Sequence, residues 1–173
     1  MSSPLTGQPW YAVSVRRHCE RSVTGILRIK GYETYLASVP GDRFRPLLPG
    51  YVFVRHDEVA VARITTSEGV IRILGYGSVA AAIPEQEMHS FMTAVESGEN
   101  PRVSPHLSEG DRVEIVDGPL RGCRGRILQT GSEHKFVVSI AMLQRSVSVG
   151  LRPEWMVRIE PSGHRLEEIY DVA

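Results

Sequence analysis

The sequence predicts an α+β fold of two domains, with strands and helices alternating in the first and a small barrel of strands in the second. Three observations predict this division. Strand-like and helix-like apolar patterns alternate over residues 10–96, two prolines and a glycine interrupt residues 97–108, and short apolar segments separated by turns fill residues 109–161. We therefore expect a linker between two domains, with a flexible tail at 1–9 and a C-terminal tail at 162–173.

The first domain begins with residues 10–15, whose apolar and polar side chains alternate as in a strand. Residues 19–27 place their apolar side chains on one side of a helix, and Gly31 is well placed to end it. Residues 32–39 and 50–55 predict the second and third strands.

A second helix is expected to open near Asp57 and to end at the polar run 65–67. Residues 70–74 predict a fourth strand, and Pro84 suits the first position of a third helix. The resulting order is βαββαβ followed by a helix. That order predicts a ferredoxin-like arrangement, an antiparallel sheet with helices on one face.

The second domain shows five short apolar segments between turns that are rich in glycine and charge. The expected strands are residues 113–116, 126–128, 136–140, 146–149 and 156–159. Five short strands in so few residues predict a small SH3-like barrel. Alternating β-branched residues in the third and fourth segments favour strands over helices there.

The zero net charge hides an uneven distribution of charge along the chain. Residues 1–55 carry eight Lys/Arg and three acids, whereas residues 56–100 carry two Lys/Arg and seven acids. A one-sided basic face could contact phosphates. Alternatively, these are ordinary solvated charges that segregate in sequence and mix in space.

Several classes of protein find no support in the sequence. No apolar run approaches the roughly 20 residues of a membrane helix, and the N-terminal residues lack the pattern of a secretory signal. Cys19 and Cys123 are predicted to be reduced thiols, so we expect a cytoplasmic protein. The six histidines are scattered without metal-ligand spacing, and no nucleophile motif is present. We therefore expect no enzyme activity, metal or cofactor.

The most distinctive local pattern lies in the second domain. Val113 and Ile115 alternate before a turn of closely spaced residues, Gly118, Pro119, Leu120, Gly122 and Gly125. This pattern resembles the KOW motif of the NusG family. Residues 10–13, 48–54 and 69–74 resemble the N-terminal domain of the same family, and the motifs follow the family order over residues 10–160.

Residues 143–149 and the apolar turn at 48–51 resemble most closely the specialised NusG paralogues of the UpxY and RfaH kind. Those paralogues act as antiterminators for particular operons, often for surface polysaccharides. The resemblance therefore implies a role on RNA polymerase.

The resemblance implies that an apolar patch of the first domain docks on the clamp helices of the largest polymerase subunit. The residues carried over to this patch are Tyr11, Leu48, Pro49, Tyr51 and Phe53. Aromatic anchors in an apolar groove suit a helical partner. One side of the strand must fill the core of the domain, and we expect Val52 and Val54 there. Of Tyr51 and Phe53, we expect Tyr51 to make the contact with the partner. Leu47 is assigned to neither.

Two further contacts are implied. Thr65, Thr66 and Ser67 lie where RfaH-like paralogues meet the polymerase gate loop, although such a run is equally typical of a helix C-terminus. Arg16 and Arg17 follow the first strand, where those paralogues contact the non-template DNA strand. The connection at 40–45 is shorter than the hairpin or loop common in relatives, so the contacts of that loop are not carried over.

The KOW domain of the family recruits a second partner, either a ribosomal small-subunit protein or the termination factor Rho. The residues expected on this surface are Leu120, Ile140, Met142 and Leu143. Met and Leu in a loop suit an adaptable binding surface, although they could as well close the end of the barrel. We expect the protein to be a monomer.

The resemblance thus implies a non-enzymatic transcription elongation factor specialised toward antitermination. Two other functions stay open. One is a housekeeping NusG that couples polymerase to Rho or to the ribosome, and the other is an RNA-binding or ribosome-binding KOW module.

Overall fold

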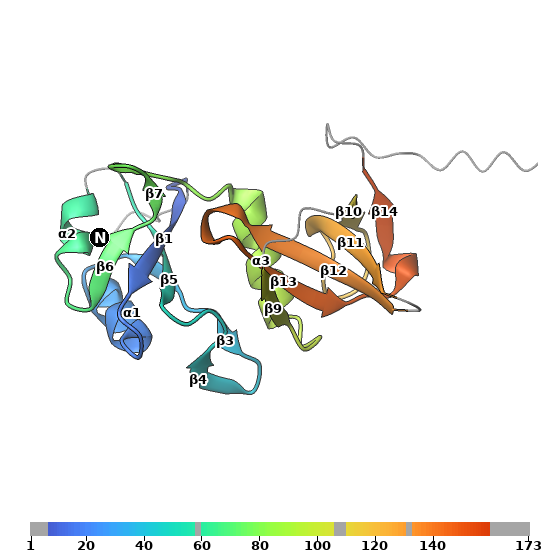
Figure 1. Ribbon diagram of the computed structural model, residues 1–173, viewed down its shortest axis with the longest axis horizontal. Coiled ribbons are helices and arrows are strands. Elements are labelled where there is room, and N and C mark those ends of the chain that lie inside the picture. The colour runs from blue at the N-terminus through green and yellow to red at the C-terminus, as the bar shows by residue number, and fades with distance from the viewer. Residues whose placement is uncertain (1–6, 58–59, 106–109, 131–132, 160–173) are drawn as a thin grey trace, which may run out of the picture.

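The computed structural model describes residues 7–57, 60–105, 110–130 and 133–159. They form two lobes along the long axis of the molecule, with helix α3 (Glu85–Glu96) between them (Figure 1). Of the expected tails, residues 1–6 and 162–173 lie outside the described part of the chain.

A four-stranded antiparallel sheet forms the centre of the N-terminal lobe, with the strand order β2-β5-β1-β6. Its strands are β1 (Trp10–Val15), β2 (Glu33–Tyr35), β5 (Tyr51–Arg55) and β6 (Val70–Ile73). Successive side chains of a strand point to opposite faces. Val13 and Val52 therefore belong to one core layer, and Ala12 and Phe53 to the other.

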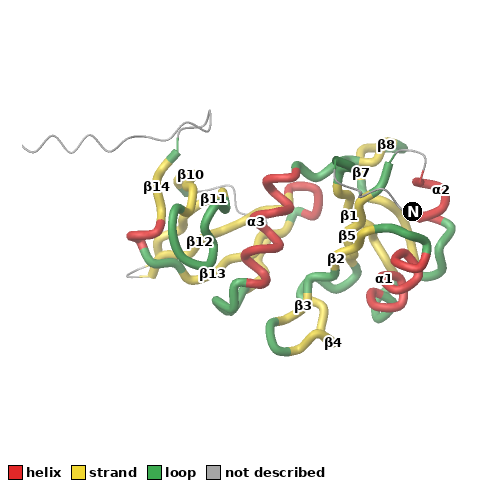
Figure 2. Tube along the Cα trace, turned by 180° about the vertical axis from the view of Figure 1, so that it is seen from behind, coloured by secondary structure: helices red, strands yellow, loops and turns green. Residues whose placement is uncertain are grey.

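Helices α1 (Glu20–Ile29) and α2 (Val61–Thr65) cover the first face of this sheet (Figure 2). Val23 and Leu27 are four residues apart on α1, so they lie on one side of the helix, and both are fully buried. Ile64 of α2 joins the same cluster. This layer holds Val52 and Val54, as the sequence predicts.

Helix α3 covers the opposite face of the sheet, which corrects the expectation of helices on one face only. The ring of Phe91 lies 5.3 Å from that of Phe53 and 6.3 Å from that of Tyr35, measured between centroids. Met88 and Trp10 are buried in the same cluster. The apolar side of α3 was predicted, but the surface that it covers was not.

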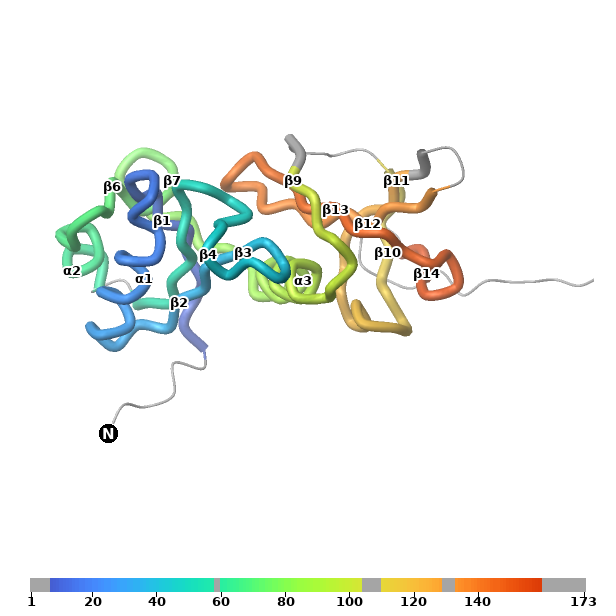
Figure 3. Tube along the Cα trace, turned by 90° about the horizontal axis from the view of Figure 1, so that it is seen from below, coloured from blue at the N-terminus to red at the C-terminus, as the bar shows by residue number. Residues whose placement is uncertain are grey.

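Two small hairpins extend from the N-terminal lobe. One pairs β3 (Ser38–Val39) with β4 (Asp42–Pro46), and the other pairs β7 (Gly75–Tyr76) with β8 (Val79–Ala80). The first contains the connection at 40–45 that was expected to be shorter than the hairpin or loop of relatives, and it forms a short hairpin (Figure 3). A turn at Gly41, with φ +81°, reverses the chain within a few residues and makes this short hairpin possible.

The C-terminal lobe is a six-stranded antiparallel sheet in the order β14-β10-β11-β12-β13-β9. Its strands are β9 (Arg102–Pro105), β10 (Asp111–Ile115), β11 (Arg124–Thr130), β12 (Glu133–Ile140), β13 (Arg145–Gly150) and β14 (Met156–Arg158). All five expected strands are present. The sixth, β9, pairs with β13 and lies within the expected linker at 97–108, so that segment is in part a strand.

Buried side chains of the C-terminal strands, among them Val113, Ile115 and Phe136, form one continuous cluster with α3 and the second face of the N-terminal sheet. Within the C-terminal lobe, the turn at Gly118 packs tightly against Trp155, because a Cβ at Gly118 would lie 2.7 Å from the Trp155 ring. No described helix has the length and apolar character needed to cross a membrane.

Candidate functional site

The apolar turn that precedes β5 is held rigidly against β1 and α1. The backbone N–H of Gly50 donates to the Glu20 carboxylate at 2.8 Å, and the N–H of Val15 donates to the Gly50 carbonyl at 2.9 Å. Gly50 has φ +88°, a conformation that suits glycine. The turn is therefore a fixed feature that presents Pro49 to solvent.

Tyr51 and Phe53 lie on the same side of β5 but in different surroundings. Phe53 is fully buried under α3, whereas Tyr51 is half-buried at the edge of the same cluster. Leu48 is buried, and Leu47, which the sequence assigned to neither role, packs half-buried against this cluster. The exposed part of the expected docking patch therefore consists of Pro49 and Tyr51.

Tyr11 lies on the other face of the sheet, beneath α1 and α2. It is paired in register with Val54, and its ring stacks on that of His56 with centroids 4.1 Å apart. Because neighbouring residues of β1 face opposite ways, Tyr11 does not share a surface with Tyr51. The expectation that these two tyrosines lie on one patch is corrected.

Thr65, Thr66 and Ser67 close the C-terminal end of α2. Thr65 donates to the Val61 carbonyl at 3.0 Å, and Thr66 donates to the Ala62 carbonyl at 2.8 Å. Ser67 is buried and accepts a hydrogen bond from Lys30 Nζ at 2.7 Å. Of the three side chains, that of Thr66 is the most accessible to a partner.

Arg16 and Arg17 lie in the loop between β1 and α1, and both are exposed. The backbone N–H of Arg16 donates to the Gly69 carbonyl at 2.8 Å, which fixes this loop beside β6. Neither guanidinium forms an ion pair with any residue that the structure describes. Both are thus free to meet an anionic partner.

The residues expected on the KOW partner surface lie against α3. Leu120, Ile140 and Leu143 are buried, and Met142 packs half-buried on the same cluster that contains Phe91. These side chains are therefore largely buried in the structure, within the cluster that α3 shares with the C-terminal strands. The sequence alone left open whether these side chains face a partner or the core.

Polar side chains of α3 complete the contact with the C-terminal lobe. Ser90 Oγ accepts from the Arg124 N–H at 2.9 Å, and Glu87 accepts from the Ala141 N–H at 3.2 Å. Gln86 donates to the Gly122 carbonyl at 3.2 Å. The sequence analysis did not predict these contacts. Glu87 and Ser90 are next in sequence to the apolar Met88 and Phe91, and this proximity could have indicated that they lie at the edge of a buried face.

Two titratable groups report burial against α3, Cys123 from the C-terminal lobe and Tyr35 from strand β2 of the N-terminal sheet. Burial raises the pKa of the Cys123 thiol, although the Thr93 and Ser90 hydroxyl groups oppose the shift. Burial also raises the pKa of the Tyr35 phenol, and the nearby Glu96 carboxylate, at the end of α3, adds to the effect. The arrangement is one of packing and hydrogen bonding rather than of catalytic groups.

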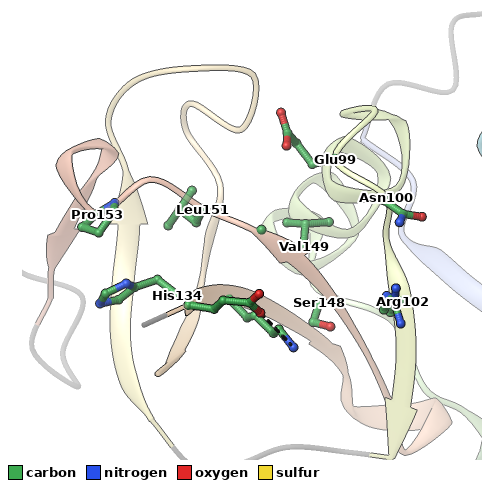
Figure 4. Close-up of a pocket in the computed structure, with 11 residues that line it drawn as sticks. Glu99, Asn100, Arg102, His134, Ser148, Val149, Leu151 and Pro153 are labelled. Atoms are coloured by element: carbon green, nitrogen blue, oxygen red, sulfur yellow. Dashed lines mark ion pairs between the residues drawn. The ribbon is translucent and has the colours of Figure 1, made fainter. Parts of the chain in front are cut away.

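A groove of about 690 Å³ lies on the C-terminal lobe beside β9 and β13 (Figure 4). Its charged side chains are Glu99, Arg102, Glu133 and Lys135, and His134 also lines it. Lys135 and Glu133 form an ion pair at 3.8 Å. The opposite charges in the groove therefore largely balance. Elsewhere too, within the described residues, no group of three His, Cys, Asp or Glu side chains could hold a metal.

Residues 8–92 match the model of the NusG family, described as "Transcription termination factor nusG". This segment is similar to the N-terminal domain of that family. It comprises the four-stranded sheet, α1, α2 and the first part of α3, and its relatives are transcription factors. A comparison with curated proteins finds no match.

One solved structure shows a similar fold over 90% of this chain, and a second structure is also matched. The structure described as "Domain interaction in Thermotoga maritima NusG" is 21% identical, with a TM-score of 0.54 over 90% of this chain and 99% of that chain. The structure described as "Crystal Structure of MjSpt4:Spt5 complex conformation A" is 19% identical, with a TM-score of 0.33 over 87% of this chain and 98% of that chain.

Proposed function

We propose that this chain is a NusG-like transcription elongation factor that docks on the clamp helices of RNA polymerase and suppresses pausing or termination. The observation that carries the proposal is the fixed turn at residues 47–51 within the segment that is similar to the N-terminal domain of the NusG family. Glu20 and Val15 hold the turn in place, and Tyr51 keeps an accessible ring at its end. A preorganised aromatic anchor binds a helical partner at little cost in conformational entropy.

The strand order of the N-terminal lobe supports a ferredoxin-like fold, and the six-stranded C-terminal lobe supports an SH3-like KOW barrel. The KOW residues Leu120, Ile140, Met142 and Leu143 form the surface for a second partner, a ribosomal small-subunit protein or Rho. Because α3 covers this surface, the barrel must leave α3 before it binds that partner. Two contacts on separate lobes would then reinforce one another as a bivalent tether.

Thr66 and the exposed Arg16 and Arg17 supply further contacts, to the polymerase gate loop and to the non-template DNA strand respectively. The two arginines support the DNA contact because no described carboxylate neutralises them. Bridging the two jaws of the cleft would hold the polymerase closed and disfavour pausing.

We infer operon-specific antitermination from the resemblance of residues 48–51 and 143–149 to specialised paralogues. The alternative is a general factor that couples polymerase to Rho or the ribosome. Genome-wide mapping of the genes that the protein occupies separates the two. A specialised factor is confined to a few operons, whereas occupancy of nearly every transcribed gene would exclude operon-specific antitermination.

The docking proposal is tested by a pull-down of purified bacterial RNA polymerase core with the variant Tyr51→Glu. A charge placed in an apolar contact is expected to weaken polymerase binding about thirtyfold, the effect of losing one strong anchor. Tyr76→Glu is the control for an added charge, because Tyr76 is an exposed tyrosine on the β7–β8 hairpin, away from this turn. Polymerase capture by Tyr51→Glu at the wild-type level, with native circular dichroism, would exclude clamp docking through this turn.

A further inference from the structure

A cavity lies where the start of α3 meets the outer face of the C-terminal sheet. Its volume is about 530 Å³, within the range of roughly 300–1,000 Å³ that is usual for small-molecule sites. One wall consists of Pro84, Gln86 and Glu87, and the rest belongs to the C-terminal lobe. Helix α3 runs beside strands β11 and β12 (Figure 2). A molecule bound in this cavity therefore contacts both lobes.

The floor of the cavity is apolar. Side chains alternate along β12, so Val137 lies on the outer face of the sheet, whereas Phe136 and Val138 belong to the core cluster. Val137 is nevertheless only 1% exposed, and Ile159, which also lines the cavity, is buried. Val137 pairs in register with Arg126, whose aliphatic stem suits the covering of such a side chain. The cavity thus has a packed base.

Three arginines line the cavity, Arg112 on β10 and both Arg124 and Arg126 on β11. Arg112 pairs in register with Arg126, and Glu114 pairs with Arg124, so these four side chains lie on one face of the two strands. Like charges directly opposite one another destabilise an antiparallel pair of strands. An anion held between Arg112 and Arg126 would relieve this repulsion.

Local contacts neutralise only part of the positive charge. The guanidinium of Arg124 lies 3.1 Å from the Glu114 carboxylate, and Arg126 Nη1 donates to the Gly110 carbonyl at 2.8 Å. On the opposite wall, the Glu87 carboxylate accepts a backbone N–H of the C-terminal lobe at 3.2 Å. Three arginines against two carboxylates leave a net positive charge at the cavity. A guanidinium also carries five N–H donors in a planar fork that matches the oxygens of a phosphate.

We propose that this cavity binds a small ligand with two linked phosphate groups. Arg112 and Arg126 hold one phosphate between them, and Arg124 contacts the second. Nucleoside diphosphates and pyrophosphate share this chemistry. In a nucleoside diphosphate, the apolar floor at Val137 and Ile159 also receives the base.

The bound ligand strengthens the contact between the two lobes, because α3 forms one wall of the cavity and the sheet forms the others. The site uses none of the residues proposed to meet polymerase or DNA, and it does not depend on docking to polymerase. Loss of polymerase binding in Tyr51→Glu would leave this site untouched, and failure of this site would leave the docking proposal untouched.

The test is isothermal titration calorimetry of the full chain with pyrophosphate, ADP and sulfate at equal ionic strength. We expect pyrophosphate to bind about tenfold more tightly than sulfate, because sulfate can engage only one of the two phosphate positions. Tighter binding of ADP than of pyrophosphate identifies a nucleotide site, and equal affinity identifies a site for the diphosphate alone. Binding of sulfate as tight as that of pyrophosphate would overturn the proposal of two linked phosphates.

Arg112→Ala and Arg126→Ala are each expected to weaken pyrophosphate binding about tenfold, as for one lost charge-assisted hydrogen bond. Arg126→Lys keeps the charge but not the planar fork, so it should also bind more weakly, and it serves if Arg126→Ala fails to fold. Arg145→Ala is the matched control, because Arg145 is an exposed arginine of the same lobe that lies on β13. It should bind pyrophosphate as the wild type does.

Hydrogen exchange tests the bridging of the lobes. Saturating pyrophosphate should slow exchange at the Arg124 and Ala141 amides, which donate to α3, in the wild type but not in Arg112→Ala. Wild-type protein that fails to bind pyrophosphate, or Arg112→Ala that binds it as tightly as Arg145→Ala, would overturn the site. Tight binding with unchanged exchange at both amides would overturn the bridging.

Discussion

The carboxylate of Glu20 accepts a hydrogen bond from the backbone N–H of Gly50 at 2.8 Å, which joins the first turn of α1 to the turn before β5. Glu20 is buried although it is an acid. Its position at the N-terminus of the helix favours a negative charge, and the Gly50 N–H satisfies one of its oxygens. This single contact positions the turn that carries Tyr51.

Replacing Glu20 is therefore expected to loosen the turn and to destabilise the N-terminal lobe. Glu20→Ala leaves the Gly50 N–H without an acceptor and should lower the free energy of unfolding by about 2 kcal/mol. Glu20→Gln keeps a carbonyl oxygen at the same place and should lower it by about 1 kcal/mol. Urea unfolding measures both, with Glu68→Ala as the control because Glu68 is exposed. Equal stability of Glu20→Ala and Glu68→Ala would contradict this role.

The KOW-like turn offers a matched pair of glycines for a second test. Gly118 and Gly122 have φ values of +77° and +85°, so alanine is strained at both by about 1–2 kcal/mol. A Cβ at Gly118 would also lie 2.7 Å from the Trp155 ring, whereas one at Gly122 meets nothing within 4 Å. We expect Gly118→Ala to lose about 2 kcal/mol more than Gly122→Ala in urea unfolding, because the Trp155 ring must move. Similar losses would show that this packing contributes nothing.

Much of the N-terminal lobe could be predicted because its signals are local. Alternation along β5 assigns Val52 and Val54 to one core layer. This assignment uses only the local sequence of the strand and requires no knowledge of residues far away in the chain. The same alternation cannot separate Tyr51 from Phe53, since both lie on one side of the strand. The long-range packing of Phe91 on Phe53 makes that distinction.

Other features could not be predicted, since they depend on contacts between segments far apart in sequence. The apolar side of α3 is visible from Met88 and Phe91, but its position between two lobes is not. Strand β9 was missed because its residues include a proline and an exposed Val103, which suit an edge strand as well as a linker. The cavity beside α3 carried no signal, because only the structure places Arg112 opposite Arg126.

The contact between α3 and the C-terminal lobe is expected to open when Ser90 is replaced by a long charged residue. Ser90 is fully buried and accepts from the Arg124 N–H, so Ser90→Arg cannot be accommodated without separating the lobes. Hydrogen exchange should then accelerate at the Arg124 and Ala141 amides, which donate to α3 in the wild type. His89→Arg is the control, because His89 is the exposed neighbour on the same helix. Unchanged protection of both amides in Ser90→Arg would contradict the assignment of this interface.

The half-buried phenol of Tyr35 predicts a loss of stability at alkaline pH. Burial and then the Glu96 carboxylate raise its pKa above the ordinary value of 10.0, so the folded protein favours the neutral phenol. The stabilisation is complete below pH 10.0 and is lost as the pH rises above that value, because only the unfolded chain then releases the proton. The free energy of unfolding should fall by up to about 1.4 kcal/mol for each pH unit in this range. Urea unfolding of the wild type and Tyr35→Phe across this range measures the difference, with Tyr76→Phe as the control. If Tyr35→Phe loses stability as steeply as Tyr76→Phe does, the alkaline transition arises elsewhere in the chain.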